Sequence, residues 1–361
     1  MIKPLNLLVI GAGHGGQALA GNLAQMGHKI VLCPRTVQKA ELMRQKRYIA
    51  LSGCLKGKAK LEGIATDVKE ALQGKDMTFI VTDATRHGAW AEILAPFAEG
   101  QHFVLFGSPG IGAALEFSRQ INGKNPIAAF NTTETDTLLY ACRAEEPGNV
   151  HVFGIKKDIR YATVSVNGRM PAFALKGIFP QSHDTEHPLV GLYNVGFQFH
   201  ISGMIMNAEK VKAGKLTYFY KEAITLEVAK FITEMDNERR KVAEAVGVEA
   251  ISCEQWLWRA YRTPRGSLYK MIQNTRAYGK IGAPDTLDHR YIKQEILLKA
   301  LPAIEIGNVL GIEMPHFKEI VDKACELLGI DFWKNGRTLS DMGLDKAALL
   351  SKNKGDLLKV S

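Results

Sequence analysis

The clearest pattern in the chain is an apolar run that passes into a glycine-rich turn and then into a segment with helical spacing. The run is LLVI at 7–10, the turn is GAGHGG at 11–16, and apolar residues then recur at three- and four-residue intervals. Gly27 ends this segment, and a second apolar run, KIVLC, follows at 29–33. Strand, glycine turn, helix and strand within about thirty residues are typical of a dinucleotide-binding βαβ unit.

Each glycine of the turn has its own physical reason. Gly11 permits the tight turn after the strand, Gly13 has no side chain that would keep a pyrophosphate from the backbone, and Gly16 lets the helix lie close to the sheet. The free N–H groups and the dipole at the start of the helix favour the negative charge of a diphosphate. We therefore predict that Gly11, Gly13, His14, Gly15 and Gly16 line a dinucleotide cofactor.

Beyond this unit, short apolar runs alternate with segments of helical spacing, which predicts a parallel sheet covered by helices on both faces. We predict strands at 77–82, 102–107 and 126–132, and a hairpin within 44–66. The stretches NVHVFGIKK, from position 149, and RYATVSV, from position 160, alternate apolar and polar residues. We expect both to be antiparallel strands that close the same sheet.

The sequence changes character after residue 181. A polar stretch, SHDTEHP, leads into long segments with helical spacing, which glycines and prolines punctuate up to the end of the chain. The predicted fold class is α/β, with a doubly wound Rossmann-type sheet over residues 1–181 and an all-helical domain over residues 182–361.

Composition narrows the class of protein. A chain of 361 residues with 46% hydrophobic and 23% charged residues suits two soluble domains. No apolar run approaches the roughly twenty residues that a membrane helix needs, so we expect no membrane partner. The net charge of +9 is spread along the chain without a basic block interleaved with aromatic residues. This favours attraction of anionic substrates over nucleic-acid binding.

The cysteines and the remaining composition bear on compartment and assembly. The five cysteines are scattered and lack CxxC spacing, so we expect reduced thiols, a cytoplasmic protein and no metal site. The sequence is compatible with a homodimer but does not define the oligomeric state.

The end of the second strand is where a nicotinamide-binding fold distinguishes NAD from NADP. An acidic residue there would accept hydrogen bonds from the ribose hydroxyls and favour NAD, but this chain has Arg35 and Thr36 instead. Both can contact a 2′-phosphate, so we predict NADP, with NAD as the alternative; the competing interpretation of Arg35 is a solvated loop residue. Loops after later strands would bring Thr82, Ala84 and Pro109 to the cofactor.

The predicted helical domain offers residues for proton transfer and for carboxylate binding. His200 lies in an apolar segment and can exchange a proton near neutral pH, although a lone histidine there is also compatible with a hydrogen-bonded core residue. Arg290 offers a fork for a carboxylate, and Glu295 follows five residues later; such a pair is equally compatible with a solvated helix face.

Several motifs resemble the opine dehydrogenases, also called the octopine/nopaline dehydrogenase family. The ACR-x-x-x-PG-x-V segment and the GRTL-x-x-x-GL segment near the chain end do not follow from general Rossmann physics. The resembling segments run nearly end to end: GAGHGG at 11–16, PGIGAALEF at 109–117, ETDTLLYACRAEEPGNV at 134–150, NVGFQFH at 194–200, HRYIKQE at 289–295 and GRTLSDMGL at 336–344.

The resemblance implies an NAD(P)H-dependent reductive condensation of an α-keto acid, often pyruvate, with the amino group of an amino acid. By motif position, His200 matches the catalytic histidine and Arg290 the arginine that grips a substrate carboxylate. Glu295 falls where the family has an aspartate that orients the histidine, so its arm is one methylene longer. The acidic residue usual after the second strand in NAD-using members is missing, in agreement with the NADP prediction.

Two other functions compete with this interpretation. One is another two-domain reductase of a 2-keto compound, of the ketopantoate reductase or glycerol-3-phosphate dehydrogenase type, in which a lysine is the principal catalytic cation; Lys210 or Lys293 would then have to serve. The other is a sensor that binds NADPH without turning it over. Consumption of NADPH only when a keto acid and an amino acid are both present would separate the opine reaction from both.

Overall fold

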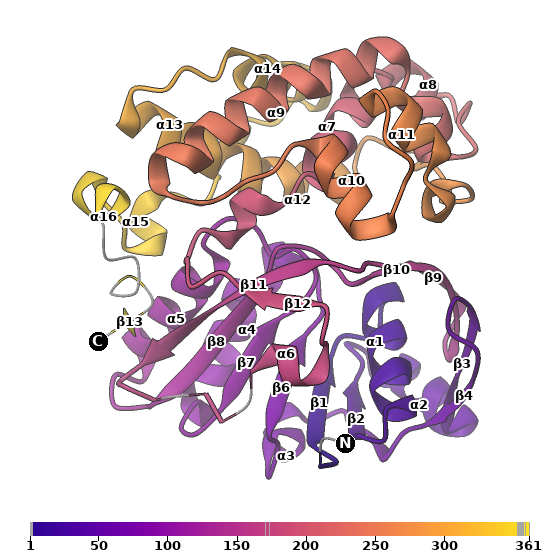
Figure 1. The fold of residues 1–361 in the computed structure, drawn as a ribbon. Coiled ribbons are helices and arrows are strands. Elements are labelled where there is room, and N and C mark those ends of the chain that lie inside the picture. The colour runs from indigo at the N-terminus through magenta and orange to yellow at the C-terminus, as the bar shows by residue number, and fades with distance from the viewer. Residues whose placement is uncertain (1–2, 170, 173, 352–356, 358, 361) are drawn as a thin grey trace. The chain divides into compact units, whose positions relative to one another are not determined.

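The computed structural model describes residues 3–169, 171–172, 174–351, 357 and 359–360 (Figure 1). The chain forms two compact units. We call them the Rossmann unit, which comprises Met1–Pro109, Ala113–Pro188 and Lys354–Ser361, and the helical unit, which comprises Gly110–Gly112 and Leu189–Asn353. The domain boundary predicted after residue 181 lies shortly before Leu189 and stays a prediction.

The Rossmann unit is built on a large sheet whose strands run in the order β12-β11-β8-β7-β6-β1-β2-β5, with β13 also paired to β11. The central strands are parallel, and β11 is antiparallel to β8. This confirms the predicted doubly wound sheet. The strands are β1 (Asn6–Ile10), β2 (Lys29–Cys33), β5 (Gly63–Ile64), β6 (Met77–Ile80), β7 (His102–Leu105), β8 (Phe130–Thr135), β11 (Ile159–Val166), β12 (Ser182–Asp184) and β13 (Lys359–Val360).

Both faces of this sheet are buried. Along β1, Leu7 and Val9 enter one apolar cluster, whereas Leu8 and Ile10 enter another on the opposite face. This is why the strand reads as a continuous apolar run. The helices of the unit are α1 (His14–Gln25), α2 (Val37–Lys46), α3 (Val68–Leu72), α4 (His87–Leu94), α5 (Ala113–Lys124) and α6 (Leu175–Ile178), with 3₁₀ turns η1 (Ala84–Arg86) and η2 (Ala95–Phe97).

A second, four-stranded sheet has the order β4-β3-β10-β9 and lies beside α1 (Figure 1). Its antiparallel pair β3 (Tyr48–Gly53) and β4 (Gly57–Lys60) is the predicted hairpin. The prediction for β10 (Asn149–Ile155) was wrong in part: it pairs with β3 and with β9 (Tyr140–Glu146), and does not close the main sheet. Alternation of buried and exposed residues shows that one face of a strand is covered, but it does not identify the neighbouring strand.

The strand predicted at 126–132 begins later than expected, at Phe130. Pro126 has no N–H for a ladder, and the side chain of Ile127 is 88% exposed. The prediction therefore started the strand too early, because Ile127 is apolar but lies in a turn before the strand.

The helical unit contains, within its described residues, helices and helical turns but no long strand. The stretches 189–212 and 217–246, whose helical spacing is continuous in the sequence, are each divided into shorter elements. The elements are η3 (Val190–Tyr193), α7 (Gly196–Ile205), α8 (Ala208–Lys212), η4 (Phe219–Ala223), α9 (Leu226–Val246), α10 (Cys253–Tyr261), α11 (Leu268–Asn274), η5 (Arg276–Tyr278), α12 (Arg290–Glu295), η6 (Ile296–Ala300), α13 (Leu301–Leu310), α14 (Pro315–Leu328), η7 (Phe332–Lys334), α15 (Leu339–Met342) and α16 (Lys346–Leu350).

Local signals explain where the long helix α9 begins and ends. The side chain of Thr225 accepts a hydrogen bond from the Val228 N–H, and Gly247 ends the helix in the left-handed conformation at φ 86°. Among the described residues, no helix is both long and apolar enough to cross a membrane.

Candidate active site

The glycine turn between β1 and α1 has the geometry that the sequence predicts. Gly11 adopts φ 104°, and a Cβ there would lie 2.4 Å from the Val81 carbonyl oxygen. A Cβ on Gly16 would lie 1.9 Å from the Gly11 carbonyl oxygen, so the helix and the turn approach as only glycine permits. A Cβ on Gly13 would meet nothing within 4 Å, and no side chain caps the N-terminus of α1. These features fit a diphosphate at the start of α1.

His14 is the first residue of α1 and is exposed. Its Nδ1 accepts a hydrogen bond from the Ala144 N–H at 2.8 Å, so the ring links the turn to β9 of the small sheet. Gly15 packs against the Leu138 side chain, where an added Cβ would come within 3.1 Å of a methyl group. Contacts with Leu138 and Ala144 therefore help to fix the position of the turn.

At the end of β2, Arg35 is exposed and Thr36 is the N-cap of α2. The Thr36 hydroxyl oxygen accepts a hydrogen bond from the Lys39 N–H, so its hydrogen can still be donated to a ligand. Burial, followed by the charge of Arg35, lowers the pKa of Lys39, so the two cations both contribute positive charge at the start of α2. A cationic pair at a helix N-terminus suits a phosphate monoester.

The other predicted cofactor residues follow β6 and β7 of the main sheet. Thr82 donates a hydrogen bond to the Asp83 carbonyl oxygen at 3.4 Å, and Asp83 caps the turn that contains the buried Ala84. Pro109 is buried at the end of the loop after β7. The carboxyl ends of parallel strands are where such folds bind their ligands, so all three positions are compatible with the predicted role.

In the helical unit, two of the predicted catalytic residues are in contact. His200 lies midway along α7, Glu295 ends α12, and the Nδ1 of His200 is 2.8 Å from the Oε1 of Glu295. The Glu295 side chain is 2% exposed and that of His200 is 15% exposed. A lone histidine in an apolar helix and an acid 95 residues away thus form one buried pair.

Three further residues of this cluster were not predicted. Lys299, in the π-helical turn η6, pairs with the Oε2 of Glu295. Tyr220, in the π-helical turn η4, has its hydroxyl 2.9 Å from the Nε2 of His200. The ring of Tyr291 stacks on the His200 imidazole with centroids 3.8 Å apart and planes at 3°.

Arg290, at the start of α12, is exposed, and its guanidinium lies 5.1 Å from the centre of the Tyr291 ring. Its positive charge is one of the smaller causes that lower the pKa of His200. Within the described part of the chain, no hydrogen bond or ion pair engages the Arg290 guanidinium. The fork is thus available to a carboxylate ligand near the imidazole.

The charges in the cluster favour an ionised glutamate beside a neutral histidine. Burial alone would raise the pKa of Glu295, but Lys299 and His200 lower it to about 2. Burial lowers the pKa of His200 below its ordinary value, Glu295 opposes this, and Arg290 and Lys299 add to it. Because an ionised carboxylate only accepts hydrogen bonds, Nδ1 of His200 carries the proton and Nε2 is left for exchange.

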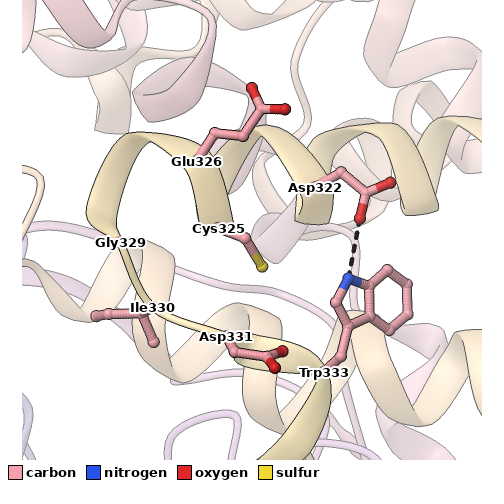
Figure 2. A pocket seen from close by; sticks show the side chains of 7 residues that line it. All are labelled: Asp322, Cys325, Glu326, Gly329, Ile330, Asp331 and Trp333. Carbon is pink, nitrogen blue, oxygen red and sulfur yellow. Dashed lines mark hydrogen bonds between the residues drawn. The ribbon is translucent and has the colours of Figure 1, made fainter.

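The helical unit also has a surface pocket away from these residues. It has a volume of about 430 Å³ and lies where α14 ends, and Figure 2 shows Trp333 donating a hydrogen bond to Asp322 across it. None of the predicted site residues lines it. Within the residues that the structure describes, no group of three histidine, cysteine or acidic side chains could hold a metal ion.

A Rossmann unit with a glycine turn that would fit a diphosphate, together with a helical unit that carries a buried histidine–carboxylate pair, is typical of two-domain nicotinamide-dependent dehydrogenases. Comparison with known proteins narrows this class. Residues 189–328 match the family described as "NAD/NADP octopine/nopaline dehydrogenase, alpha-helical domain". Residues 7–165 match the family described as "Ketopantoate reductase PanE/ApbA".

Relatives align over almost the whole chain. The opine dehydrogenase of Arthrobacter sp. (strain 1C) is 29% identical over 349 residues, which cover 95% of this chain and 96% of the relative. A structure of octopine dehydrogenase with NADH and pyruvate has a TM-score of 0.75 at 19% identity and covers 97% of this chain and 98% of its own. The structure of NADP⁺-bound yersinopine dehydrogenase has a TM-score of 0.68 at 13% identity, and the match covers 98% of this chain and 99% of that structure's chain.

The helical unit therefore matches the octopine/nopaline dehydrogenase family, and the resemblance to opine dehydrogenases that the motifs indicated is confirmed over almost the whole chain. This likeness makes it an oxidoreductase of the opine dehydrogenase type, for which the cofactor is NAD or NADP.

Proposed function

We propose that the chain catalyses the reductive condensation of an α-keto acid, with pyruvate as the first candidate, and the amino group of an amino acid. The product is an N-(carboxyalkyl) amino acid. The observation that carries the proposal is the buried His200–Glu295 pair, which lies in a unit that matches the octopine/nopaline dehydrogenase helical domain. The exposed guanidinium of Arg290 lies against the ring of Tyr291, which stacks on His200, and makes no hydrogen bond to the described residues.

In this reaction, the keto acid and the amine lose water to form a C=N bond, which then takes up a hydride and a proton. A bound reduced nicotinamide supplies the hydride. The steps that remain for the protein are to hold the carboxylates, to help water leave and to supply the proton.

We assign the proton to Nε2 of His200. Because Glu295 occupies Nδ1, Nε2 is the ring nitrogen that can protonate the departing oxygen or act as acid and base at the amine nitrogen. The hydroxyl of Tyr220 occupies Nε2 without substrate, so substrate would take its place. Glu295 fixes the imidazole tautomer and stabilises the imidazolium that forms, as an aspartate does in a hydrolase triad.

Arg290 would hold a substrate carboxylate in two parallel hydrogen bonds and so orient the C=N bond. Its exposed guanidinium and its electrostatic effect on His200 support this role. Both substrates carry a carboxylate, and the excess of positive charge on the chain favours their approach.

We propose NADP as the preferred cofactor. Arg35, Thr36 and Lys39 gather two cations and a hydroxyl at the start of α2, and no acidic residue stands directly after β2. NADP⁺-bound yersinopine dehydrogenase shows that a related fold takes this cofactor, whereas octopine dehydrogenase was solved with NADH.

The match of residues 7–165 to ketopantoate reductases favours one alternative, the reduction of a 2-keto acid to a hydroxy acid without any amine. The site chemistry differs in a way that can be tested. A keto acid reductase consumes NADPH with the keto acid alone, whereas the proposed enzyme needs the amine as well.

A panel of keto acids and amino acids, assayed by loss of NADPH or NADH absorbance, tests the proposal. We expect consumption only when both substrates are present and faster turnover with NADPH than with NADH. Arg35→Ala should reduce the preference for NADPH about 10- to 100-fold, since it removes a charge-assisted contact, while activity with NADH stays near the wild type. Consumption with a keto acid alone would favour the alternative, and tight binding without turnover would favour a sensor.

A further inference from the structure

We propose that Lys299 is a positioning residue of this site, which holds the carboxylate of Glu295 ionised and fixed in place behind His200. The inference rests on the proposed function, in which His200 exchanges the proton.

The geometry assigns each oxygen of Glu295 its own partner. Oε1 is 2.8 Å from the Nδ1 of His200, and Oε2 pairs with the Nζ of Lys299. Both Glu295 and Lys299 have side chains that are 2% exposed, so water does not compete for the carboxylate. The carboxylate is anchored on both sides and cannot rotate without breaking a buried charge-assisted contact.

The length of the glutamate side chain explains why a second contact, from Lys299 to Oε2, would matter. The family that the motifs resemble has an aspartate at the position of Glu295. Compared with that aspartate, the glutamate side chain has one more methylene and therefore one more rotatable bond. An ammonium on Oε2 removes that added freedom and keeps Oε1 directed at the imidazole. Nζ of Lys299 also lies 5.9 Å from the ring of Phe197 on α7, the helix that carries His200.

The backbone around Lys299 is fixed independently of the ion pair. Pro302 has no N–H for the carbonyl four residues earlier, that of Leu298, and this carbonyl instead accepts a hydrogen bond from the Ile111 N–H at 2.9 Å. The neighbouring Leu297 carbonyl accepts one from the Arg337 N–H at 2.9 Å. The backbone of the π-helical turn η6 is therefore held by hydrogen bonds that do not involve the Lys299 ammonium.

Stability alone is a weak explanation for a lysine at this position. Burial of an ammonium and a carboxylate costs desolvation energy that their attraction often only offsets, and an apolar pair of similar volume is commonly as stable. The charge of Lys299 has a more specific consequence in the reaction. It favours ionised Glu295, so the carboxylate does not take the proton that His200 must exchange.

Lys299 also acts on the histidine through space. Glu295, Tyr220, Tyr291, Arg290 and Lys299 are the ionisable groups that face the imidazole from η4, α12 and η6. Burial lowers the pKa of His200, Glu295 raises it, and Arg290 and Lys299 lower it further. Removal of the Lys299 charge should therefore raise the pKa of His200, while Glu295 stays bonded to the ring.

The test is the titration of the His200 imidazole in the full chain, followed by NMR of ¹⁵N-histidine-labelled protein and assigned by the signal lost in His200→Asn. We expect Lys299→Met to raise the pKa of His200 by about one pH unit, as loss of a neighbouring charge does. Lys299→Arg should restore a titration close to that of the wild type. If Lys299→Met does not fold, Lys299→Gln, which keeps a donor for Oε2 without the charge, should shift the pKa in the same direction.

Lys293→Met is the matched control, because Lys293 lies on α12 but pairs with exposed Asp288 at 2.6 Å. It removes one positive charge and should leave the His200 titration unchanged. An unchanged titration in Lys299→Met, or an equal shift in Lys293→Met, would overturn the proposal. The titration needs no substrate, so absence of turnover with every substrate pair would count against the proposed function and leave the role of Lys299 standing.

Discussion

His200 has both ring nitrogens engaged by side chains, and this defines what the residue can do. Nδ1 faces the ionised Glu295, and Nε2 faces the hydroxyl of Tyr220. Burial keeps the neutral form dominant near neutral pH, since it lowers the pKa of the imidazole. A neutral histidine with a fixed tautomer is a base in the oxidative direction and, once protonated, an acid in the reductive direction.

The pH dependence of the oxidative reaction follows from this state. That direction needs neutral His200, so kcat/KM should fall only as pH drops through its pKa, which lies below the ordinary 6.5. His200→Asn should lower kcat/KM by about 10²- to 10⁴-fold and abolish the fall of kcat/KM at low pH. His183→Asn, which changes a partly exposed histidine of the Rossmann unit, should have little effect. If kcat/KM of His200→Asn fell at low pH as it does in the wild type, a group other than His200 would be the one that titrates.

The sequence pointed to some residues of this cluster and not to others, for physical reasons. His200, Arg290 and Glu295 were identified because they lie in motifs that resemble a family. Lys299 stands four residues after Glu295, the spacing of an ordinary helical ion pair, and only tertiary packing shows that this pair is buried. Tyr220 lies in a π-helical turn that has no sequence signature.

At the scale of elements, the glycine turn was the most predictable feature and the pairing of strands the least. The close approach of Gly16 to the Gly11 carbonyl lies within the turn itself, so six residues of sequence are enough to predict it. The place of β10 in the small sheet depends on contacts with β3, about a hundred residues earlier in the chain. Alternation within β10 carries no information on that partner.

The turn gives a direct test of element packing. Gly16→Ala would place a methyl group 1.9 Å from the Gly11 carbonyl oxygen, so the turn or α1 must shift. We expect a loss of about 1–3 kcal/mol in the free energy of unfolding and weaker NADPH binding. Denaturant titration and NADPH fluorescence measure the two effects.

Gly123→Ala is the control for that substitution. Gly123 lies in α5, and a Cβ there would meet nothing within 4 Å. This variant should be unchanged or more stable by about 0.4–1 kcal/mol, because alanine restricts the unfolded chain. Equal behaviour of the two variants would contradict the close approach of α1 to the turn.

At the scale of the whole molecule, the two units divide the chemistry of the proposed reaction. The Rossmann unit carries the turn and the cations that suit a dinucleotide, and the helical unit carries His200, the proposed proton donor, and Arg290, the proposed carboxylate-binding residue. The observed sheet and helices confirm the predicted α/β class with an all-helical second part. This class could be predicted because the hydrophobic periodicity of the sequence changes clearly along the chain. The identity of the substrates cannot be read from that periodicity.

We propose that the enzyme directs hydride to a carbon–nitrogen double bond formed from a keto acid and an amine. Mass spectrometry of products made with NADPH that carries deuterium at the transferred position tests this most directly. We expect a secondary amine dicarboxylic acid with one deuterium, formed only when both substrates are present. A deuterated 2-hydroxy acid formed from the keto acid alone would contradict it.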